Sequence, residues 1–357
     1  MTGFFRHPLI GCLCVGILTL VPTRTVSAEA PEITVATWGG VYGEALQAAV
    51  FKPFTRATGI GVRIHHHGSN FLPVLDSNRS EKRPWTVVDI ERAPLTRGCA
   101  EGAFEKLDVA EMLGKTATDD FVPGTLHPCG IGALIWSQAV AYDAAAFKKQ
   151  QPRTIADFFD LQAFPGNRGL FAGAEGNLEI ALMADGIPPE DVYDILRKPG
   201  GVDQALAILE RLRPVARFWQ DGAVPEQLLN DGQVVMTTAY AARFLRPRQG
   251  ARRPVGLMWS NQLWRATYWA IPAGQRRTVD AQRFISFATD PPRLGELAAR
   301  LWFGPARKSG FDAAPPNIRE DLPTARRHFH DALQIDGGFW DEFGPTIELR
   351  FQAWRGG

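Results

Sequence analysis

The fold class is decided by the segment EITVATWGGVYGEALQAAVFKPFTRATGIGVRI, residues 32–64. It begins with a run rich in β-branched residues, 32–38, which is typical of a buried strand, and Gly39-Gly40 ends that run. Residues 42–58 then place apolar side chains three and four positions apart, as on one buried face of a helix. A second short strand is expected at 62–64. The segment therefore predicts a β-α-β unit.

The same alternation of strands and helices continues beyond this unit. Helices are expected from Thr154, at 178–185, 189–196 and 202–212, and in the last third of the chain at 278–289, 292–301 and 339–354. Further strands are expected at 87–90, 131–142, 234–238 and 264–271. This alternation indicates an α/β protein of two lobes, in which 131–142 carries the chain out of the first lobe and 264–271 carries it back.

The first residues indicate export. Arg6 precedes the apolar run Leu9–Val21, which is followed by the small residues Val26-Ser27-Ala28. This order is typical of a secretory signal peptide cleaved after Ala28, and we expect a periplasmic protein. The apolar run is about a dozen residues long, whereas a spanning helix needs ~20. Lipidation at Cys12 is an alternative, but Cys12 precedes most of the apolar run.

Cleavage would leave 329 of the 357 residues, more than one hydrophobic core usually supports. We therefore expect a signal peptide at 1–28, a first lobe formed by 29–135 together with 273–357, and a second lobe formed by 136–272. Loss of Arg6 and Arg24 leaves 37 basic against 38 acidic residues, a formal charge of −1. Such a balance gives no reason to expect nucleic acid or anionic lipid as a partner.

Two of the four cysteines lie in the leader, which leaves Cys99 and Cys129 in the mature chain. In an oxidising compartment such a pair tends to form a disulfide, which stabilises by ~3–4 kcal/mol on the chain-entropy model. Metal binding is the weaker alternative, because no second pair stands at a ligand spacing. Three consecutive histidines, 65–67, also predict no metal site, because neighbouring side chains on a strand point to alternate faces.

The chain has no motif of the common hydrolases. It contains no Gly-x-Ser-x-Gly, no His-Glu-x-x-His and no phosphate-binding glycine-rich loop. We therefore expect neither an enzyme nor a cofactor, and a secreted hydrolase is the alternative from another functional class.

Several segments, in order along the mature chain, carry a resemblance to a known family. They include TWGGVYGEALQAAVFKPFTRATGIGV, VVDIERAPLTRGCAEGAFEKLD, DGQVVMTTAYAARF and YWAIPAG. The sequence resembles the polyamine-type periplasmic solute-binding proteins of ABC transporters. That resemblance implies a type II periplasmic-binding-protein fold, with a hinge of two crossing strands and a small ligand held between the lobes. It also implies delivery by a monomer to a permease in the inner membrane, with a membrane signalling receptor as the alternative recipient.

Ligands of open α/β sheets bind beyond the carboxyl ends of the strands, so residues that follow strands are candidates. Aromatic residues there can hold a ligand or merely fill the space between the lobes. Gly39 and Gly40 allow backbone N–H groups to approach a ligand. The candidate ligand-binding residues are Trp38, Gly39, Gly40, Ser69, Glu91, Trp136, Glu175, Tyr240, Arg243 and Trp264.

The charges among these candidates favour a ligand with an anionic group. Polyamine receptors of the family place an acid where this chain has Arg243, and the segment LWRATYWAIP also lacks the acid they carry. A guanidinium suits a carboxylate, sulfonate or phosphonate. With Glu91 or Glu175 facing an ammonium group, the site would suit an ω-amino acid or a related zwitterion. The alternative for Arg243 is pairing with a neighbouring acid or exposure to solvent, and the alternative cargo is a polyamine. Arg265 is expected to point outward.

Overall fold

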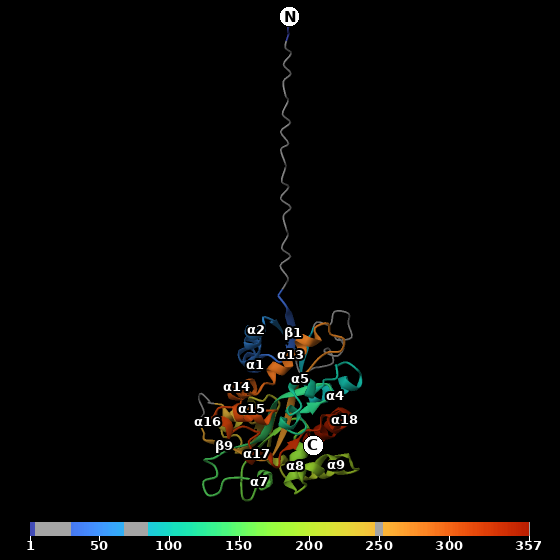
Figure 1. Cartoon of the computed structure of the whole chain (residues 1–357). Coiled ribbons are helices and arrows are strands. Elements are labelled where there is room, and N and C mark those ends of the chain that lie inside the picture. The colour runs from blue at the N-terminus through green and yellow to red at the C-terminus, as the bar shows by residue number, and fades with distance from the viewer. Residues whose placement is uncertain (4–29, 68–84, 247–252, 357) are drawn as a thin grey trace. The chain divides into compact units, whose positions relative to one another are not determined.

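The computed structural model describes residues 1–3, 30–67, 85–246 and 253–356 (Figure 1). The chain divides into two units, Met1–Ala30 and Pro31–Gly357, and all helices and strands described below belong to the second. Most of the expected signal peptide, and Ser69, lie outside the described residues. Within the described ranges, no helix has the length and apolar character needed to cross a membrane.

The strands of the described chain form one sheet in the order β2-β1-β3-β9-β5-β8-β6-β7. Its centre is the antiparallel pair β5 (Gly130–Asp143) and β9 (Val255–Ala270), the two longest strands. Three mutually parallel strands lie beyond β9 and three beyond β5. The other strands are β1 Glu32–Thr37, β2 Gly61–His66, β3 Val87–Glu91, β4 Leu126–His127, β6 Arg168–Phe171, β7 Ala216–Trp219, β8 Met236–Tyr240, β10 Gly304–Pro305 and β11 Leu333–Gln334.

The β-α-β unit forms as the sequence predicts, with β1 and β2 parallel. The helix between them runs through α1 (Gly40–Leu46), a π-helical turn at 47–51 and α2 (Lys52–Thr58). Its apolar stripe is fully buried, as Leu46, Val50 and Phe54 show. Gly59 ends the helix with φ of 75°, a left-handed conformation that glycine adopts without steric cost.

The main hydrophobic clusters lie on either side of the central strand pair. One contains β1, the α1–α2 helix, α13 (Thr278–Ala288) and α14 (Pro291–Leu301). The other contains α8 (Asn177–Ala184), α10 (Gly201–Leu209) and helices near them. Figure 1 shows α1 and α2 at one end of the second unit, and α7, α8 and α9 at the other. The remaining helices are α4 Arg92–Ala100, α5 Val109–Leu113, α6 Ala117–Asp120, α7 Ile155–Phe159, α9 Val192–Arg197, α11 Val224–Asn230, α12 Ala242–Leu245, α15 Lys308–Ala313, α16 Pro316–Arg319 and α17 Arg326–Phe329, with 3-10 turns at Pro189–Asp191 and Arg213–Val215.

The C-terminal helix α18 (Gly337–Gly356) packs against α4 and α10, and its Trp340 donates a hydrogen bond to Glu179 of α8. The helix buries Phe339, Ile347 and Phe351 in the hydrophobic cluster of α8 and α10. The sequence pattern places 273–357 with the first lobe, but these contacts join the last helix to the cluster of the second. The lobe boundaries therefore stay a prediction, while the pair of crossing strands is present as expected.

Cys99 of α4 and Cys129, just before β5, form the expected disulfide. Their Cα atoms are 5.9 Å apart and the bond closes a separation of 30 residues. The prediction of this bond is confirmed. The disulfide ties the helix that follows Glu91 to the first crossing strand.

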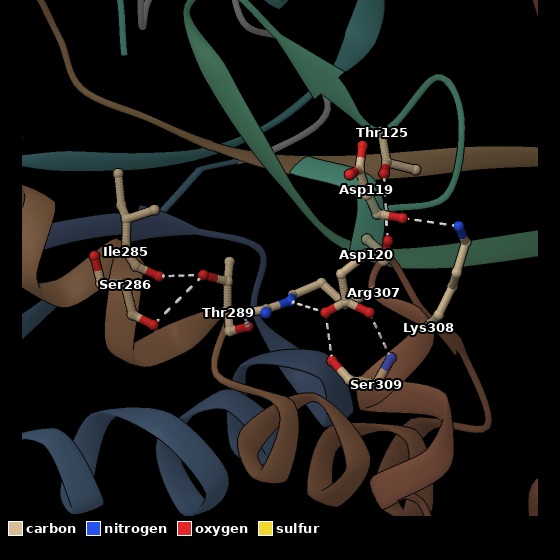
Figure 2. A network of polar contacts seen from close by, with 10 residues as sticks. Asp119, Asp120, Thr125, Ile285, Ser286, Thr289, Arg307, Lys308 and Ser309 are labelled. Carbon is tan, nitrogen blue, oxygen red and sulfur yellow. Dashed lines mark hydrogen bonds and ion pairs between the residues drawn. The ribbon is translucent and has the colours of Figure 1, made fainter. Parts of the chain in front are cut away.

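A network of polar contacts fastens α6 to the start of α15 (Figure 2). Asp120 accepts hydrogen bonds from Arg307 Nε at 2.7 Å, from the Ser309 backbone nitrogen at 2.9 Å and from the Ser309 hydroxyl. Arg307 also donates to the Thr289 carbonyl at 3.1 Å. Burial opposes ionisation of Asp120, but the bonds from Ser309 and Arg307 outweigh it and lower the pKa of this carboxyl group.

Candidate functional site

A pocket of about 340 Å³ lies against the central strands, and we call it the aromatic pocket. It is lined by residues from β3, β5, β8, β9 and the α1 region. Among the described residues, Glu91 is its only charged lining residue. The aromatic side chains that line it are Trp38, Tyr42, Trp136, Tyr240 and Phe303. The structure thus brings together four of the residues chosen from the sequence, namely Trp38, Glu91, Trp136 and Tyr240.

A second pocket, of about 410 Å³, shares Glu91 with the first, and we call it the charged pocket. Its other charged lining residues come from α4, β9, α18 and the segment after β6. Those that matter for the site are Arg265 and Glu175. Because Glu91 lines both pockets, one ligand can reach an aromatic and a charged environment at once.

Arg265 is the cation at the centre of this arrangement. It lies opposite Trp136 in the β5–β9 ladder, and its guanidinium carbon is 4.9 Å from the centre of that indole ring. It forms an ion pair with Glu175, and its side chain is 14% exposed. Burial lowers the pKa of Arg265, and the charge of Glu91 opposes that shift. The expectation that Arg265 points outward is wrong.

The strand parity of β9 explains why Arg265 was missed. Successive side chains of a strand point to opposite faces, so Trp264 and Arg265 point away from each other. The structure buries Trp264 in a core cluster, where its ring lies 5.2 Å from that of Phe329. Arg265 and Thr267 line the pockets instead. The sequence alone does not show which face of a crossing strand is turned to the ligand.

Three further candidates, Gly39, Gly40 and Arg243, do not line either pocket. Arg243 is on an exposed position of α12, and Gly39 and Gly40 form the start of α1 without lining either pocket. The glycine with a close approach here is Gly43, because a Cβ atom on it would lie 2.8 Å from the Trp38 carbonyl oxygen. Across the described chain, no group of three or more His, Cys, Asp or Glu side chains is arranged to hold a metal ion.

Glu91 is the last residue of β3 and precedes α4. Burial raises the pKa of its carboxyl group, and the charge of Arg265 opposes that rise. A carboxylate held at such a cost, beside a cavity and near a cation, is typical of a ligand site. The arrangement places an anion, Glu91, and a cation, Arg265, on the lining of the charged pocket, and Glu91 also lines the aromatic pocket.

A model of the bacterial extracellular solute-binding protein family matches residues 49–324. The chain belongs to this family. It is 37% identical over 327 residues to the gamma-aminobutyric acid-binding protein of Pseudomonas aeruginosa, a match that covers 92% of each chain. Membership of an extracellular family implies a periplasmic location, and its relatives are transport proteins that bind solutes rather than enzymes.

Solved structures of binding proteins share the fold of this family member. An ABC transporter substrate-binding protein from Bradyrhizobium japonicum superposes with a TM-score of 0.77 at 27% identity, covering 91% of this chain and 99% of that one. The Atu4243-GABA receptor superposes with a TM-score of 0.75 at 24% identity, covering 91% and 97%. The expected two-lobed type II periplasmic-binding-protein fold is thereby confirmed.

Proposed function

We propose that this protein is the ligand-capturing component of an ABC importer, and that its cargo is an ω-amino acid such as γ-aminobutyrate. The observation that carries the proposal is that Glu91 lines both pockets, while Arg265 lines the charged pocket and its charge acts on Glu91. A zwitterion with charges at its two ends matches this pair. The gamma-aminobutyric acid-binding relative, 37% identical, supports the same ligand class.

The ammonium group of the ligand is assigned to the aromatic pocket. Faces of Trp and Tyr rings attract cations, the more so when water is excluded. Trp38, Trp136 and Tyr240 supply such rings, and Glu91 supplies the opposite charge. A ligand without a positive charge at this end would leave the buried Glu91 carboxylate without a counter-ion in the aromatic pocket.

The carboxylate group is assigned to Arg265. A guanidinium has five N–H donors in a planar fork, and the ion pair with Glu175 is formed through one of its nitrogens, Nη2. Donors therefore remain for a ligand carboxylate. Stacking on Trp136 holds the guanidinium plane in place and limits its access to water.

Arg243 remains the sequence-based alternative for this anion-binding role. Its exposed position on α12 is close enough to Tyr240 to influence the phenol's pKa, which the positive charge of Arg243 lowers against the larger effects of burial and Glu91. Substitution of each arginine separates the two assignments.

The test is a calorimetric titration with γ-aminobutyrate, butyrate and putrescine. Butyrate lacks the ammonium group and putrescine lacks the carboxylate, so each should bind at least about tenfold more weakly, the equivalent of one lost charged contact. Arg63→Gln is a control, because Arg63 is an exposed guanidinium paired with Glu32. Tighter binding of putrescine than of γ-aminobutyrate would establish the polyamine reading and overturn this proposal.

We also propose that a signal peptide cleaved after Ala28 exports the chain, and that it acts as a monomer that passes its ligand to an inner-membrane permease. The extracellular family and the ABC transporter relative support this role. N-terminal sequencing of the exported protein tests the cleavage site. Ligand uptake in membranes containing the permease from neighbouring genes separates transport from receptor signalling.

A further inference from the structure

Asp89 is a fully buried carboxyl group on β3, two residues before Glu91. Its Oδ2 atom accepts a hydrogen bond from the Thr37 hydroxyl at 2.9 Å and another from the Tyr42 hydroxyl at 2.8 Å. Its Oδ1 atom has no hydrogen-bond partner among the described groups. Because Tyr42 lines the aromatic pocket, this carboxyl group is joined to the pocket through one side chain.

The indole ring of Trp38 lies between two residues that Asp89 holds. It meets the Tyr42 ring edge-on at 5.7 Å and the His67 ring edge-on at 5.1 Å. Tyr42 is bound by the Asp89 carboxyl group, and His67 Nε2 donates to the Asp89 backbone oxygen at 3.0 Å. These two aromatic neighbours of the Trp38 ring are therefore both bonded to Asp89, one to its carboxyl group and one to its backbone oxygen.

Burial of a carboxyl group at this position costs free energy. Burial raises the pKa of Asp89 to about 8, the bonds from Tyr42 and Thr37 oppose that rise, and Glu91 adds to it. Among the described residues, the groups that act on the Asp89 carboxyl group are the hydroxyls of Thr37 and Tyr42 and the acid Glu91, none of which is a counter-ion. An apolar residue would pack there without this cost, so the carboxyl group has a role other than filling the core.

We propose that Asp89 is a positioning residue for ligand capture, which orients Trp38 as a wall of the aromatic pocket through the bond between its carboxyl group and Tyr42. The bond from His67 goes to the Asp89 backbone oxygen, which any residue at this position would supply. This inference rests on the proposed function, because Trp38 is taken to face the ammonium group of the ligand. Asp89 itself does not touch the ligand. It acts by removing the freedom of the Tyr42 ring, on which Trp38 rests.

The test compares Asp89→Asn, which keeps an acceptor oxygen for Tyr42, with Asp89→Ala, which removes it. One measurement is the indole N–H resonance of Trp38 in the ligand-free protein, assigned by its loss in Trp38→Phe. The other is the dissociation constant for γ-aminobutyrate. We expect Asp89→Ala to shift or broaden the Trp38 resonance and to weaken binding about tenfold, the effect of one lost buried hydrogen bond. Asp89→Asn should stay within about threefold of the unsubstituted protein.

Tyr42→Phe is the companion variant, because it removes only the phenol oxygen and remains informative if Asp89→Ala does not fold. It should reproduce the shifted Trp38 resonance, and the double variant Asp89→Ala/Tyr42→Phe should bind no more weakly than the worse single variant. Asp143 gives the matched control. It is also a buried carboxylate, but it pairs with Arg253 at 2.6 Å and lines neither pocket, so Asp143→Asn should change neither measurement.

The outcomes separate this inference from the proposed function. An unchanged Trp38 resonance in both Asp89→Ala and Tyr42→Phe, or unchanged affinity despite a shifted resonance, overturns the positioning role. If the unsubstituted protein does not bind γ-aminobutyrate, the proposed function is overturned. In that case, a shifted or broadened Trp38 resonance in Asp89→Ala would still show that Asp89 orients Trp38, and an unchanged resonance would show that it does not.

Discussion

Arg307 and Arg265 have nearly the same immediate surroundings. Each is 14% exposed, each pairs with a carboxylate, and each lies over an aromatic ring, at 5.3 Å from Phe121 and 4.9 Å from Trp136. They differ in what surrounds the pair. Around Arg307, Asp120 accepts two bonds from Ser309 and the Thr289 carbonyl accepts another from the guanidinium (Figure 2).

Around Arg265, the surroundings are a cavity and a further acid. The charged pocket of about 410 Å³ opens beside the guanidinium, and burial raises the pKa of the nearby Glu91 carboxyl group. Burial acts on both acids, but the bonds from Ser309 and Arg307 outweigh it and lower the pKa of Asp120, whereas burial prevails over the charge of Arg265 and raises the pKa of Glu91. An arginine–carboxylate ion pair is therefore structural when neighbouring protein groups supply its remaining hydrogen bonds, as at Arg307. It is available to a ligand when it borders a cavity, as at Arg265.

The largest expected effect is that of Arg265→Gln on ligand binding. Loss of the guanidinium removes the assigned partner of the ligand carboxylate, so affinity for γ-aminobutyrate should fall about a hundredfold, or ~2.7 kcal/mol. Calorimetric titration measures this loss. The double variant Arg265→Gln/Glu175→Gln removes the unpaired acid as well and should bind equally weakly. Affinity within threefold of the unsubstituted protein would contradict the role of Arg265.

The corresponding substitution at the Arg307 ion pair is Asp120→Ala, which should lower the stability of the fold without changing ligand binding. It leaves Arg307 and the Ser309 groups without their acceptor, and we expect the free energy of unfolding to fall by about 2 kcal/mol. Urea titration measures the stability, and calorimetry of the folded protein should give an unchanged dissociation constant. Weakened ligand binding in this variant would end the distinction between the two arginines.

Glu91→Gln is expected to have a smaller effect on binding than Arg265→Gln. The amide keeps the shape of the side chain but removes the charge opposite the ligand ammonium, so affinity should fall about tenfold. The free energy of unfolding should not fall at neutral pH, because burial of the ionised carboxyl group carries a cost. Butyrate, which has no ammonium group, serves as the control ligand and should be unaffected.

The contributions of Asp89, beside the aromatic pocket, and of Asp120, beside Arg307, to the free energy of unfolding should change with pH in opposite directions. The raised pKa of Asp89, about 8, means that the folded protein keeps a proton which the unfolded chain releases near pH 4. Its contribution to stability is complete below pH 4 and is lost as pH rises towards 8. Asp120 has a lowered pKa, so its contribution is present above pH 4 and is lost as pH falls below that value.

Urea titrations between pH 3 and pH 8.5 measure both slopes. Asp89→Asn should flatten the decline between pH 5 and pH 8, and Asp120→Asn should flatten the decline on the acid side. The same slope in Asp89→Asn as in the unsubstituted protein would show that Asp89 does not hold this proton.

The smallest effect is expected for Arg243→Gln. Because Arg243 is exposed and lines neither pocket, its substitution should change the affinity for γ-aminobutyrate by less than about threefold. A loss of tenfold or more would restore the sequence-based assignment of the anion to Arg243.

Three features of the fold were predictable from the sequence. The β-α-β unit and the pair of crossing strands follow from local patterns of apolar residues, and the Cys99–Cys129 bond follows because the mature chain has only these two cysteines. Four pocket residues were predictable for a similar reason, since strand ends converge at one edge of a sheet. The role of Arg265 could not be predicted from the sequence. Which face of β9 is turned to the pockets depends on the packing of Trp264 against Phe329 and of Arg265 against Trp136. Asp89 and Tyr42 were missed because their bond joins residues 47 positions apart.

The most direct test of the central claim is a crystal structure of the protein with γ-aminobutyrate bound. The ligand carboxylate should lie within hydrogen-bonding distance of the Arg265 guanidinium, and the ammonium group should lie in the aromatic pocket against Glu91. A ligand whose carboxylate is bound by Arg243, or whose two ends are reversed, would contradict the account.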